Sequence, residues 1–187
     1  MFDILIQKDK QLLIYLNSLG SEQWDPFWLF ITNQFSWAPL FLLIIYLIYK
    51  NFGWKKGTFL FFFLILMVAF SDQFTNMIRG IFERLRPNND TSINHLLRTL
   101  IEPQSYSFTS GHATTSMTFS VFIYLLFKDT YKYMKFIFIF PIVFAYSRLY
   151  LGVHFPIDIL CGATVGFILG NFFYRLQGVF TRKLFTA

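Results

Sequence analysis

The chain has 187 residues, of which 55% are hydrophobic, 22% are aromatic and only 14% are charged. A soluble domain carries roughly 25% charged residues, so this composition excludes an ordinary water-soluble globule. The aromatic content also excludes a disordered chain, because such chains are rich in charge and poor in aromatic residues. The formal net charge is +6, but no run of five or more basic residues is present, so a nucleic-acid partner is not expected. We predict an integral membrane protein.

The first segment, residues 1–22, is predicted to be an amphipathic helix lying on the membrane surface. Its apolar side chains recur with charged residues between them, a pattern typical of interfacial helices. They stand at Ile4, Leu5, Leu12, Leu13 and Leu16. The charges interrupt the apolar core that a cleavable signal peptide needs, so none is expected here.

Five further segments are predicted to cross the membrane. A helical crossing takes about 17–25 predominantly apolar residues, and the sequence offers such stretches at 26–49, 58–78, 110–127, 136–153 and 155–174. The polar stretch between the second and third spans reads as a loop outside the membrane. No internal repeat or linker divides the chain, so we expect residues 1–187 to form one domain, an all-α integral membrane bundle. Its single cysteine, Cys161, excludes an internal disulfide.

Three ionisable residues, His112, Arg148 and Asp158, fall at or within the ends of these spans. Placing a charged side chain inside a membrane costs about 2.5–3.5 kcal/mol on insertion scales, and such residues commonly mark functional sites. Any one of them alone is readily explained as an interfacial group that reaches to water. Three such residues on the same side of the membrane favour a functional site there.

The distribution of cations predicts the orientation of the bundle. If the spans alternate, one side of the membrane holds nine of the 16 Lys and Arg residues, and cations in short loops favour the cytoplasm. These nine are Lys50, Lys55, Lys56, Lys128, Lys132, Lys135, Arg175, Arg182 and Lys183. We therefore expect a multi-pass protein of the cell (inner) membrane. The opposite end, with the three ionisable residues, would then face outward, to the periplasm.

Three polar sequence strings, far apart in the chain, meet at this outward end under the same alternation. They run over residues 79–87, 107–112 and 147–158, and they contribute Arg79, Arg86 and Arg148. Guanidinium groups are planar, permanently charged and suited to bidentate contact with phosphate oxygens. The Ser110–Gly111 pair opens a predicted helix, whose first amide groups also attract an anion. Together these groups predict a phosphate-binding site.

Two histidines at this end supply reactive groups. His154 and Asp158 are four residues apart, so on a helix they share a face, and a carboxylate on one ring nitrogen raises the basicity of the other. His112, beside the expected anion site, is suited to protonate a departing oxygen near neutral pH. Alternatively, His154 and Asp158 form a structural pair or provide metal ligands. His95 is expected to be solvated, and Asp72 either pairs with an arginine or caps a polar seam.

The three strings resemble the signature of the type 2 phosphatidic acid phosphatase superfamily. That signature is Lys, six residues, Arg-Pro; then Pro-Ser-Gly-His; then Ser-Arg, five residues, His, three residues, Asp. The third part matches fully at Ser147, Arg148, His154 and Asp158, the second at residues 110–112 and the first at Arg86-Pro87. Arg79 replaces the usual Lys, which keeps the charge, and Thr109 replaces the usual Pro. The usual family bundle has six spans, one more than the number expected here.

The resemblance implies a mechanism that needs no metal and no cofactor. His154, oriented by Asp158, would attack phosphorus to form a phosphohistidine, and His112 would protonate the leaving oxygen and then activate water. The phosphate oxygens would be held by Arg79, Arg86, Arg148, Ser110 and Gly111.

The implied substrate is a lipid phosphate in the bilayer. Undecaprenyl pyrophosphate is the first expectation, with phosphatidylglycerophosphate, phosphatidic acid and a lipid A phosphate as alternatives. Two other classes of function stay open on the residues alone. In one, the arginines bind or transport a phosphate lipid without cleaving it. In the other, His112, His154 and Asp158 hold a metal ion.

Overall fold

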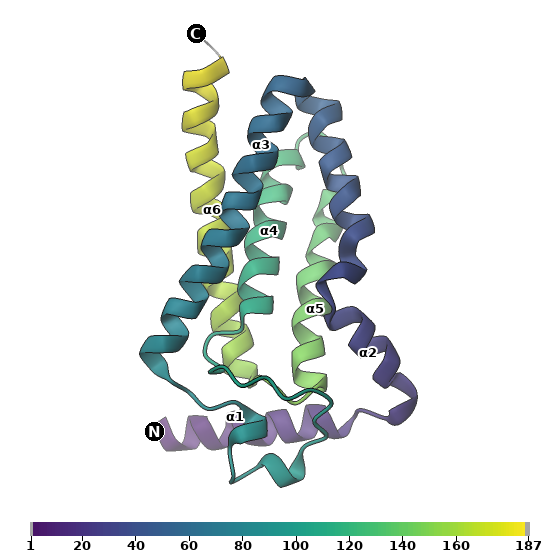
Figure 1. Ribbon diagram of the computed structural model, residues 1–187, viewed down its shortest axis with the longest axis vertical. Coiled ribbons are helices and arrows are strands. Elements are labelled where there is room, and N and C mark those ends of the chain that lie inside the picture. Colours follow the sequence, from purple (N-terminus) through teal and green to yellow (C-terminus); the bar gives the residue numbers. More distant parts are fainter. Residues whose placement is uncertain (1, 186–187) are drawn as a thin grey trace.

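The computed structural model describes residues 2–185, and this range is built from helices and connecting loops with no β-strand. Long helices stand side by side, and one helix lies across the end of the bundle (Figure 1). The α-helices are α1 (Phe2–Ser18), α2 (Asp25–Thr32), α3 (Ala38–Phe82), α4 (Gly111–Phe127), α5 (Ile139–Tyr150) and α6 (Pro156–Phe185). Short 3-10 helices occupy Glu22–Trp24, Gln34–Trp37, Pro87–Asn89, Asn94–Leu96 and Met134–Phe138. The predicted all-α fold is confirmed; residues 1, 186 and 187 of the expected 1–187 domain lie outside the described range.

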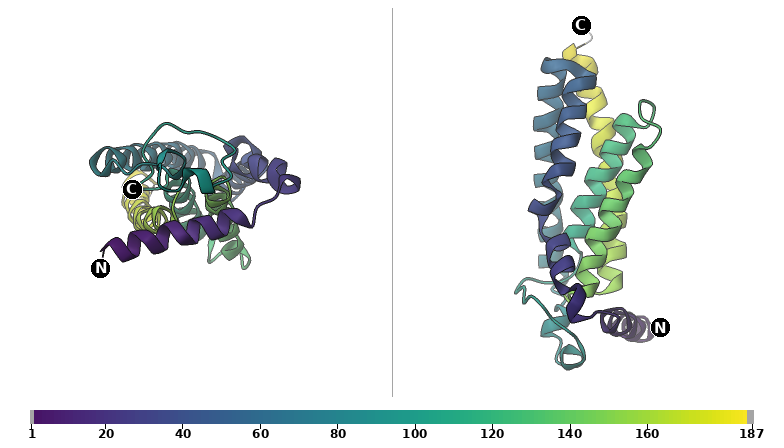
Figure 2. Two further views of the ribbon diagram at one scale, coloured as in Figure 1. Left: turned by 90° about the horizontal axis from the view of Figure 1, so that it is seen from below. Right: turned by 90° about the vertical axis from the view of Figure 1, so that its right-hand side faces the viewer.

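Helix α1 occupies most of the predicted 1–22 surface segment and lies across the end of the bundle (Figure 2). Its polar and apolar faces are arranged differently from the expectation. Ile4 and Leu5 are more than half exposed, whereas the side chains of Asp9 and Asn17 are buried. The buried amide of Asn17 donates to the carbonyl of Tyr150 at 2.7 Å. The helix therefore docks on the bundle partly through polar side chains that satisfy backbone and charged groups.

The first two predicted spans differ from the observed helices in two ways. The 26–49 span is interrupted, because α2 ends at Thr32 and the next residue, Asn33, is extended at φ −78°, ψ 120°. The loop expected between the spans is instead helical, since α3 continues through it and departs from helical geometry only at Gly53 (φ 68°, ψ 180°). A left-handed φ is accessible to glycine without a Cβ clash. Gly53 thus turns α3 back on itself as a tight hairpin at the far end of the bundle (Figure 1).

Of the remaining three predicted spans, one coincides with a single helix and two differ from the observed helices. The 110–127 prediction agrees with α4, which Ser110 precedes as its N-cap. The 136–153 stretch is divided into a 3-10 turn and the 12-residue helix α5, which ends at Tyr150. The 155–174 stretch is the first part of α6, which begins at Pro156 and continues to Phe185.

Two helical stretches in the described range are long and apolar enough to cross a bilayer, Gln34–Asn89 and Pro156–Phe185. The outer surfaces of the long helices carry large apolar side chains exposed by roughly half or more of their area, as a lipid-facing surface requires. Examples are Leu42, Phe62, Leu66, Ile142, Phe167 and Ile168. Phenylalanine rings from α3, α4, α5 and α6 form the core inside this surface. These features fit a helical membrane bundle.

Helix α4 stands at the centre of the bundle although its sequence is rich in Ser and Thr. Its hydroxyls are satisfied within the helix: Thr114 donates to the carbonyl of Ser110 at 3.0 Å, and Thr118 to that of Thr114 at 2.8 Å. Three glycines of α6 allow that helix to approach α4 closely. A Cβ atom on Gly162 would lie 2.7 Å from the Ser110 carbonyl oxygen, and one on Gly170 would lie 2.8 Å from the Thr118 carbonyl oxygen. Small residues four apart are a common device for close contact between membrane helices, and this glycine repeat was not identified in the sequence.

Replacing the central glycine of this repeat should destabilise the bundle. In Gly166→Ala the new Cβ would clash with the Thr114 carbonyl, and overpacking of this kind costs about 1–3 kcal/mol. The matched control is Gly178→Ala in the same helix, where no atom lies within 4 Å; relief of the glycine penalty there should stabilise by up to about 1 kcal/mol. Thermal denaturation in one detergent should show a lower midpoint for Gly166→Ala only. Equal midpoints for the two variants would refute the close α4–α6 contact.

Candidate active site

A cavity of about 620 Å³ lies at the end of the bundle near α1, and most of the predicted site residues line it. Its wall includes Arg79, Arg86, Gly111, His112, Arg148 and His154. These residues come from α3, the segment after α3, the start of α4, the end of α5 and the α5–α6 loop. Ser110 and Asp158 are buried immediately behind the wall. The structure thus gathers around one cavity residues that are up to 79 positions apart in the printed sequence.

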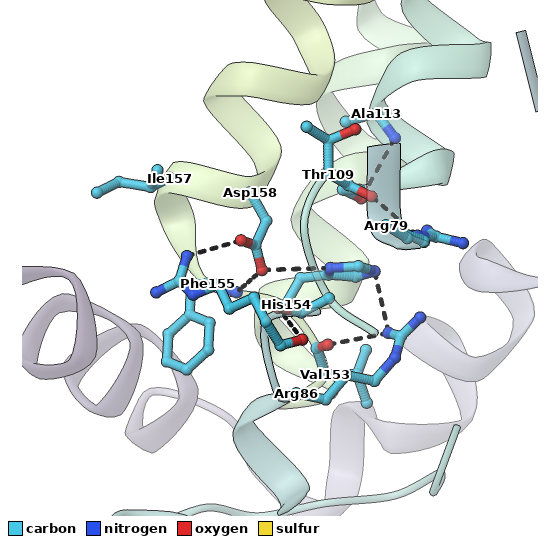
Figure 3. A network of polar contacts seen from close by, with 12 residues as sticks. Arg79, Arg86, Thr109, Ala113, Val153, His154, Phe155, Ile157 and Asp158 are labelled. Atoms are coloured by element: carbon cyan, nitrogen blue, oxygen red, sulfur yellow. Dashed lines mark hydrogen bonds and ion pairs between the residues drawn. The ribbon is translucent and has the colours of Figure 1, made fainter. Parts of the chain in front are cut away.

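The contact between Arg86 and His154 organises the centre of the site (Figure 3). Nη1 of Arg86 lies 3.0 Å from Nε2 of His154 and 3.0 Å from the Val153 carbonyl oxygen. A guanidinium can only donate hydrogen bonds, so Nε2 is the accepting nitrogen and the ring proton resides on Nδ1. The lone pair of Nε2 therefore points toward the arginine and the cavity.

Asp158 faces the other nitrogen of this imidazole. Its Oδ2 lies 3.5 Å from Nδ1 of His154 and accepts a 2.9 Å hydrogen bond from the Phe155 amide. The expectation that the two residues share a helical face was wrong: His154 lies in the loop before α6, and Asp158 is in the first turn of that helix. Pro156 begins α6 because its fixed φ suits the first helical position, while the residue before a proline is kept out of the helix. His154 can therefore turn toward the cavity independently of the helix axis.

The guanidinium of Arg79 packs against the N-terminal end of α4. Nε of Arg79 donates to the Thr109 carbonyl at 3.1 Å, and a Cβ atom on Gly111 would lie 3.0 Å from Nη2 of Arg79. Gly111 was expected to let an anion approach, but here it makes room for the guanidinium. The Ser110 side chain accepts from the Ala113 amide as a helix cap. The Ser110 amide donates to the Asp158 carbonyl at 3.1 Å, so the phosphate-binding role predicted for this pair would fall mainly to the Gly111 amide.

Thr32, at the break between α2 and α3, contacts both His112 and Arg148. The Thr32 hydroxyl accepts a 2.6 Å hydrogen bond from Nη1 of Arg148, and the Thr32 backbone bonds to the ring of His112. The other face of His112 packs against Phe144, with ring centroids 4.5 Å apart. An uninterrupted helix over 26–49 would not present both a carbonyl and a hydroxyl of Thr32 in this way, because the carbonyl would be used within the helix.

Two charged residues that sequence reasoning missed lie behind the site. Arg84 donates to Asp158 Oδ1 at 2.7 Å through Nη1 and to Asp9 Oδ2 at 2.7 Å through Nη2. Arg84 stands in the first of the three strings, two residues before Arg86, which was the one signal available in the sequence. Asp9 gave no signal, since it stands among other charges in a segment expected at the surface.

Asp72 and His95, to which the sequence assigned no role in the chemistry, lie at different distances from the site. Asp72 lines the cavity and accepts a hydrogen bond from Asn76, which in turn accepts one from Arg79. Asp72 is thus linked to Arg79 through Asn76 and not by the direct pairing with an arginine that was one of the two expected alternatives. His95 is exposed in the short 3-10 helix Asn94–Leu96, away from the cavity lining.

The electrostatic field at the site favours an anion and the neutral form of His154. Three guanidinium groups line one cavity, and burial together with the charges of Arg86 and Arg148 holds the pKa of His154 well below its ordinary value near 6.5. Within residues 2–185, His, Cys, Asp and Glu side chains do not gather in groups of three or more suited to a metal ion. The inner part of the cavity is apolar and lined by Phe41, Val68, Phe119, Phe140 and Phe144. The site therefore combines an anion-binding end with a hydrophobic pocket.

Comparison with curated proteins identifies relatives over nearly the whole chain. A lipid A 4'-phosphatase from Bacteroides thetaiotaomicron is 32% identical over 188 residues, covering 98% of this chain and 83% of that protein. A second lipid A 4'-phosphatase, from Porphyromonas gingivalis, is 25% identical and covers 93% of this chain and 75% of that protein. An undecaprenyl-diphosphatase from Sulfolobus acidocaldarius is 29% identical, covering 83% of this chain and 64% of its own length.

Solved structures share the fold. The crystal structure of a transmembrane PAP2 type phosphatidylglycerolphosphate phosphatase from Bacillus subtilis matches 97% of this chain and 88% of its own with a TM-score of 0.71 at 22% identity. That of Aquifex aeolicus LpxE covers 88% and 93% with a TM-score of 0.66 at 23% identity. Residues 60–182 match the family model described as the PAP2 superfamily, which includes all three strings that form the cavity wall. The chain therefore belongs to the PAP2 superfamily and is a membrane lipid phosphatase.

Proposed function

We propose that this phosphatase removes a phosphate monoester from a glycolipid of the lipid A type, through a phosphohistidine on His154. The observation that supports this proposal best is the arrangement around the cavity. The accepting nitrogen of one imidazole is bonded to Arg86, two more guanidinium groups and a second imidazole line the same wall, and an apolar pocket lies beside them. The chemistry needs a nucleophile, an acid, donors for the phosphate oxygens and room for a lipid. All four are provided by residues of this chain.

In the proposed first step, Nε2 of neutral His154 attacks phosphorus as the bond from phosphorus to the lipid oxygen breaks. Asp158 stabilises the positive charge that forms on the ring, and His112 donates its proton to the departing oxygen. In the second step His112 takes a proton from water, the water oxygen bonds to phosphorus and the P–N bond breaks. Inorganic phosphate leaves, and both imidazoles return to their starting forms.

The arginines are proposed to stabilise the charge on the transferring group. Phosphoryl transfer relies mainly on positioning and on donors aimed at the equatorial oxygens. Arg79, Arg86 and Arg148 line the cavity beside the attacking nitrogen, and the amides at the start of α4 lie at the same wall. Because these groups supply the positive charge, we propose that the reaction needs no metal ion.

The proposed substrate departs from the first expectation. Undecaprenyl pyrophosphate is not favoured, because the two relatives that cover most of this chain are lipid A 4'-phosphatases, whereas the undecaprenyl-diphosphatase covers less of both chains. The pocket supports a lipid substrate, since its phenylalanine lining can hold part of an acyl chain. The concentration of cations at the Gly53 end of the bundle supports a cytoplasmic location for that end and a periplasmic location for the site.

A panel of lipid phosphates should test the activity and rank the substrates. We expect purified protein in detergent to release phosphate from lipid A several-fold faster than from undecaprenyl pyrophosphate, phosphatidylglycerophosphate or phosphatidic acid, and to do so with excess EDTA present. His154→Ala is the negative control and should elute and melt like the parent protein. Tight lipid binding without phosphate release would favour the binding or transport function. Loss of activity on chelation would favour the metal-dependent one.

The protonation state of His154 offers a separate test. Its pKa is lowered, so the ring should remain neutral as the pH falls through 6.5 and take up its second proton only in more acidic solution. Nitrogen NMR of selectively histidine-labelled protein in micelles measures this directly, with His154→Ala providing the assignment. A His154 midpoint at or above its ordinary value near 6.5 would contradict the electrostatic description of the site.

A further inference from the structure

Asp9 in α1 is a buried carboxylate that the proposed chemistry does not use. Its side chain belongs to a residue only 4% exposed, and both oxygens are engaged. Oδ1 accepts a 2.9 Å hydrogen bond from the Ile157 amide at the start of α6, and Oδ2 pairs with Nη2 of Arg84 at 2.7 Å. Burying a carboxylate costs several kcal/mol unless its partners compensate. Helix α1 thus places a charge where simple docking would favour an apolar residue.

Arg84 joins the carboxylate of Asp9 to that of Asp158. Its two terminal nitrogens divide between Asp9 and Asp158, at 2.7 Å each, and its guanidinium carbon lies 3.9 Å from the centre of the Phe155 ring. Two ion pairs and a stacked ring leave the guanidinium little rotational freedom. Asp158 is held in turn by this guanidinium and by the Phe155 amide.

We infer that Asp9 and Arg84 are positioning residues, through which the docking of α1 sets the geometry of the Asp158–His154 pair. The inference rests on the proposed role of His154 as nucleophile. With Asp9 present, Arg84 shares its charge between two carboxylates, and Asp158 keeps negative charge for the imidazole. Without it, the whole guanidinium charge turns to Asp158, and the carboxylate is drawn away from Nδ1. Neither residue touches the phosphate or the reacting nitrogen.

The decisive variant is Asp9→Asn, which keeps an oxygen for the Ile157 amide and removes the charge that faces Arg84. In metal sites, loss of a partner that orients a metal-binding side chain commonly lowers activity about 10- to 100-fold, and we take the same range for loss of the partner that orients Asp158. We expect kcat for lipid phosphate hydrolysis to fall in this range while KM stays within about two-fold, since the cavity arginines are untouched. Elution volume and thermal midpoint report on folding in the same detergent.

The matched control is Asp90→Asn. Asp90 also pairs with α1, through Lys10 at 2.6 Å, but both side chains are only partly buried and the pair does not contact Arg84 or Asp158. We expect its kcat to stay within about two-fold of the parent value. Equal losses of kcat in the two variants would show that docking of α1 in general matters, and would overturn the specific role of Asp9. Parental kcat in folded Asp9→Asn would overturn it as well.

Arg84→Lys provides an independent arm, because one ammonium group cannot reproduce the two-nitrogen bridge between the carboxylates. If Asp9 acts through Arg84, the double variant Asp9→Asn, Arg84→Lys should be no slower than Arg84→Lys alone. Losses that multiply would show independent action and contradict the inference.

A spectroscopic readout separates this inference from the proposed function. The Nδ1 proton resonance of His154 should move in Asp9→Asn and stay in place in Asp90→Asn, whether or not any lipid is hydrolysed. An inactive parent protein would refute the proposed function alone. An unmoved resonance in Asp9→Asn would refute the positioning role alone.

Discussion

The hydrogen bond between Arg86 and His154 is the interaction on which the rest of the site depends. A guanidinium donor 3.0 Å from Nε2 requires that nitrogen to be an acceptor, which assigns the ring proton to Nδ1 and directs it toward Asp158. The same contact sets a permanent positive charge beside the nitrogen proposed to attack phosphorus. The proposed nucleophile and a guanidinium that can donate hydrogen bonds to a phosphate are therefore adjacent before any substrate binds, and the proposed reaction would need little reorganisation.

Arg79, Arg86 and Arg148 line the cavity, and Arg84 lies behind it. This cluster of positive charge is stable only if the surrounding fold supplies partners for it. Asp9 and Asp158 neutralise Arg84 on the inner side, while Arg86 is fixed by the Ser105 carbonyl at 2.6 Å and Arg148 by Thr32. These partners come from α1, the α2–α3 break, the loop after α3 and α6. Helices that are distant in sequence are thus tied together at the end where the charges meet. The opposite end, near the α3 hairpin, is held by phenylalanine packing.

Much of the site was predictable because its spacing is local. The third string places His154, Pro156 and Asp158 within five residues, so the chemistry could be read directly, although the proline converts the expected shared helical face into a loop and a first turn. The break after Thr32 was missed, although Pro39, in the first turn of α3, is the kind of residue that commonly starts or interrupts a helix. The partnership of Asp9 with Arg84 was equally hidden, because an ion pair across 75 residues leaves no local pattern.

The central claim, a covalent phosphate on His154, can be tested by rapid quenching. Protein mixed with radiolabelled lipid phosphate and quenched in alkali within milliseconds should carry label that is stable in base and released in acid, and mass spectrometry should locate it on the peptide containing His154. The label should appear and decay at rates that account for turnover. Active enzyme that shows no labelled protein at any time, or a label on another residue, would contradict the proposed mechanism.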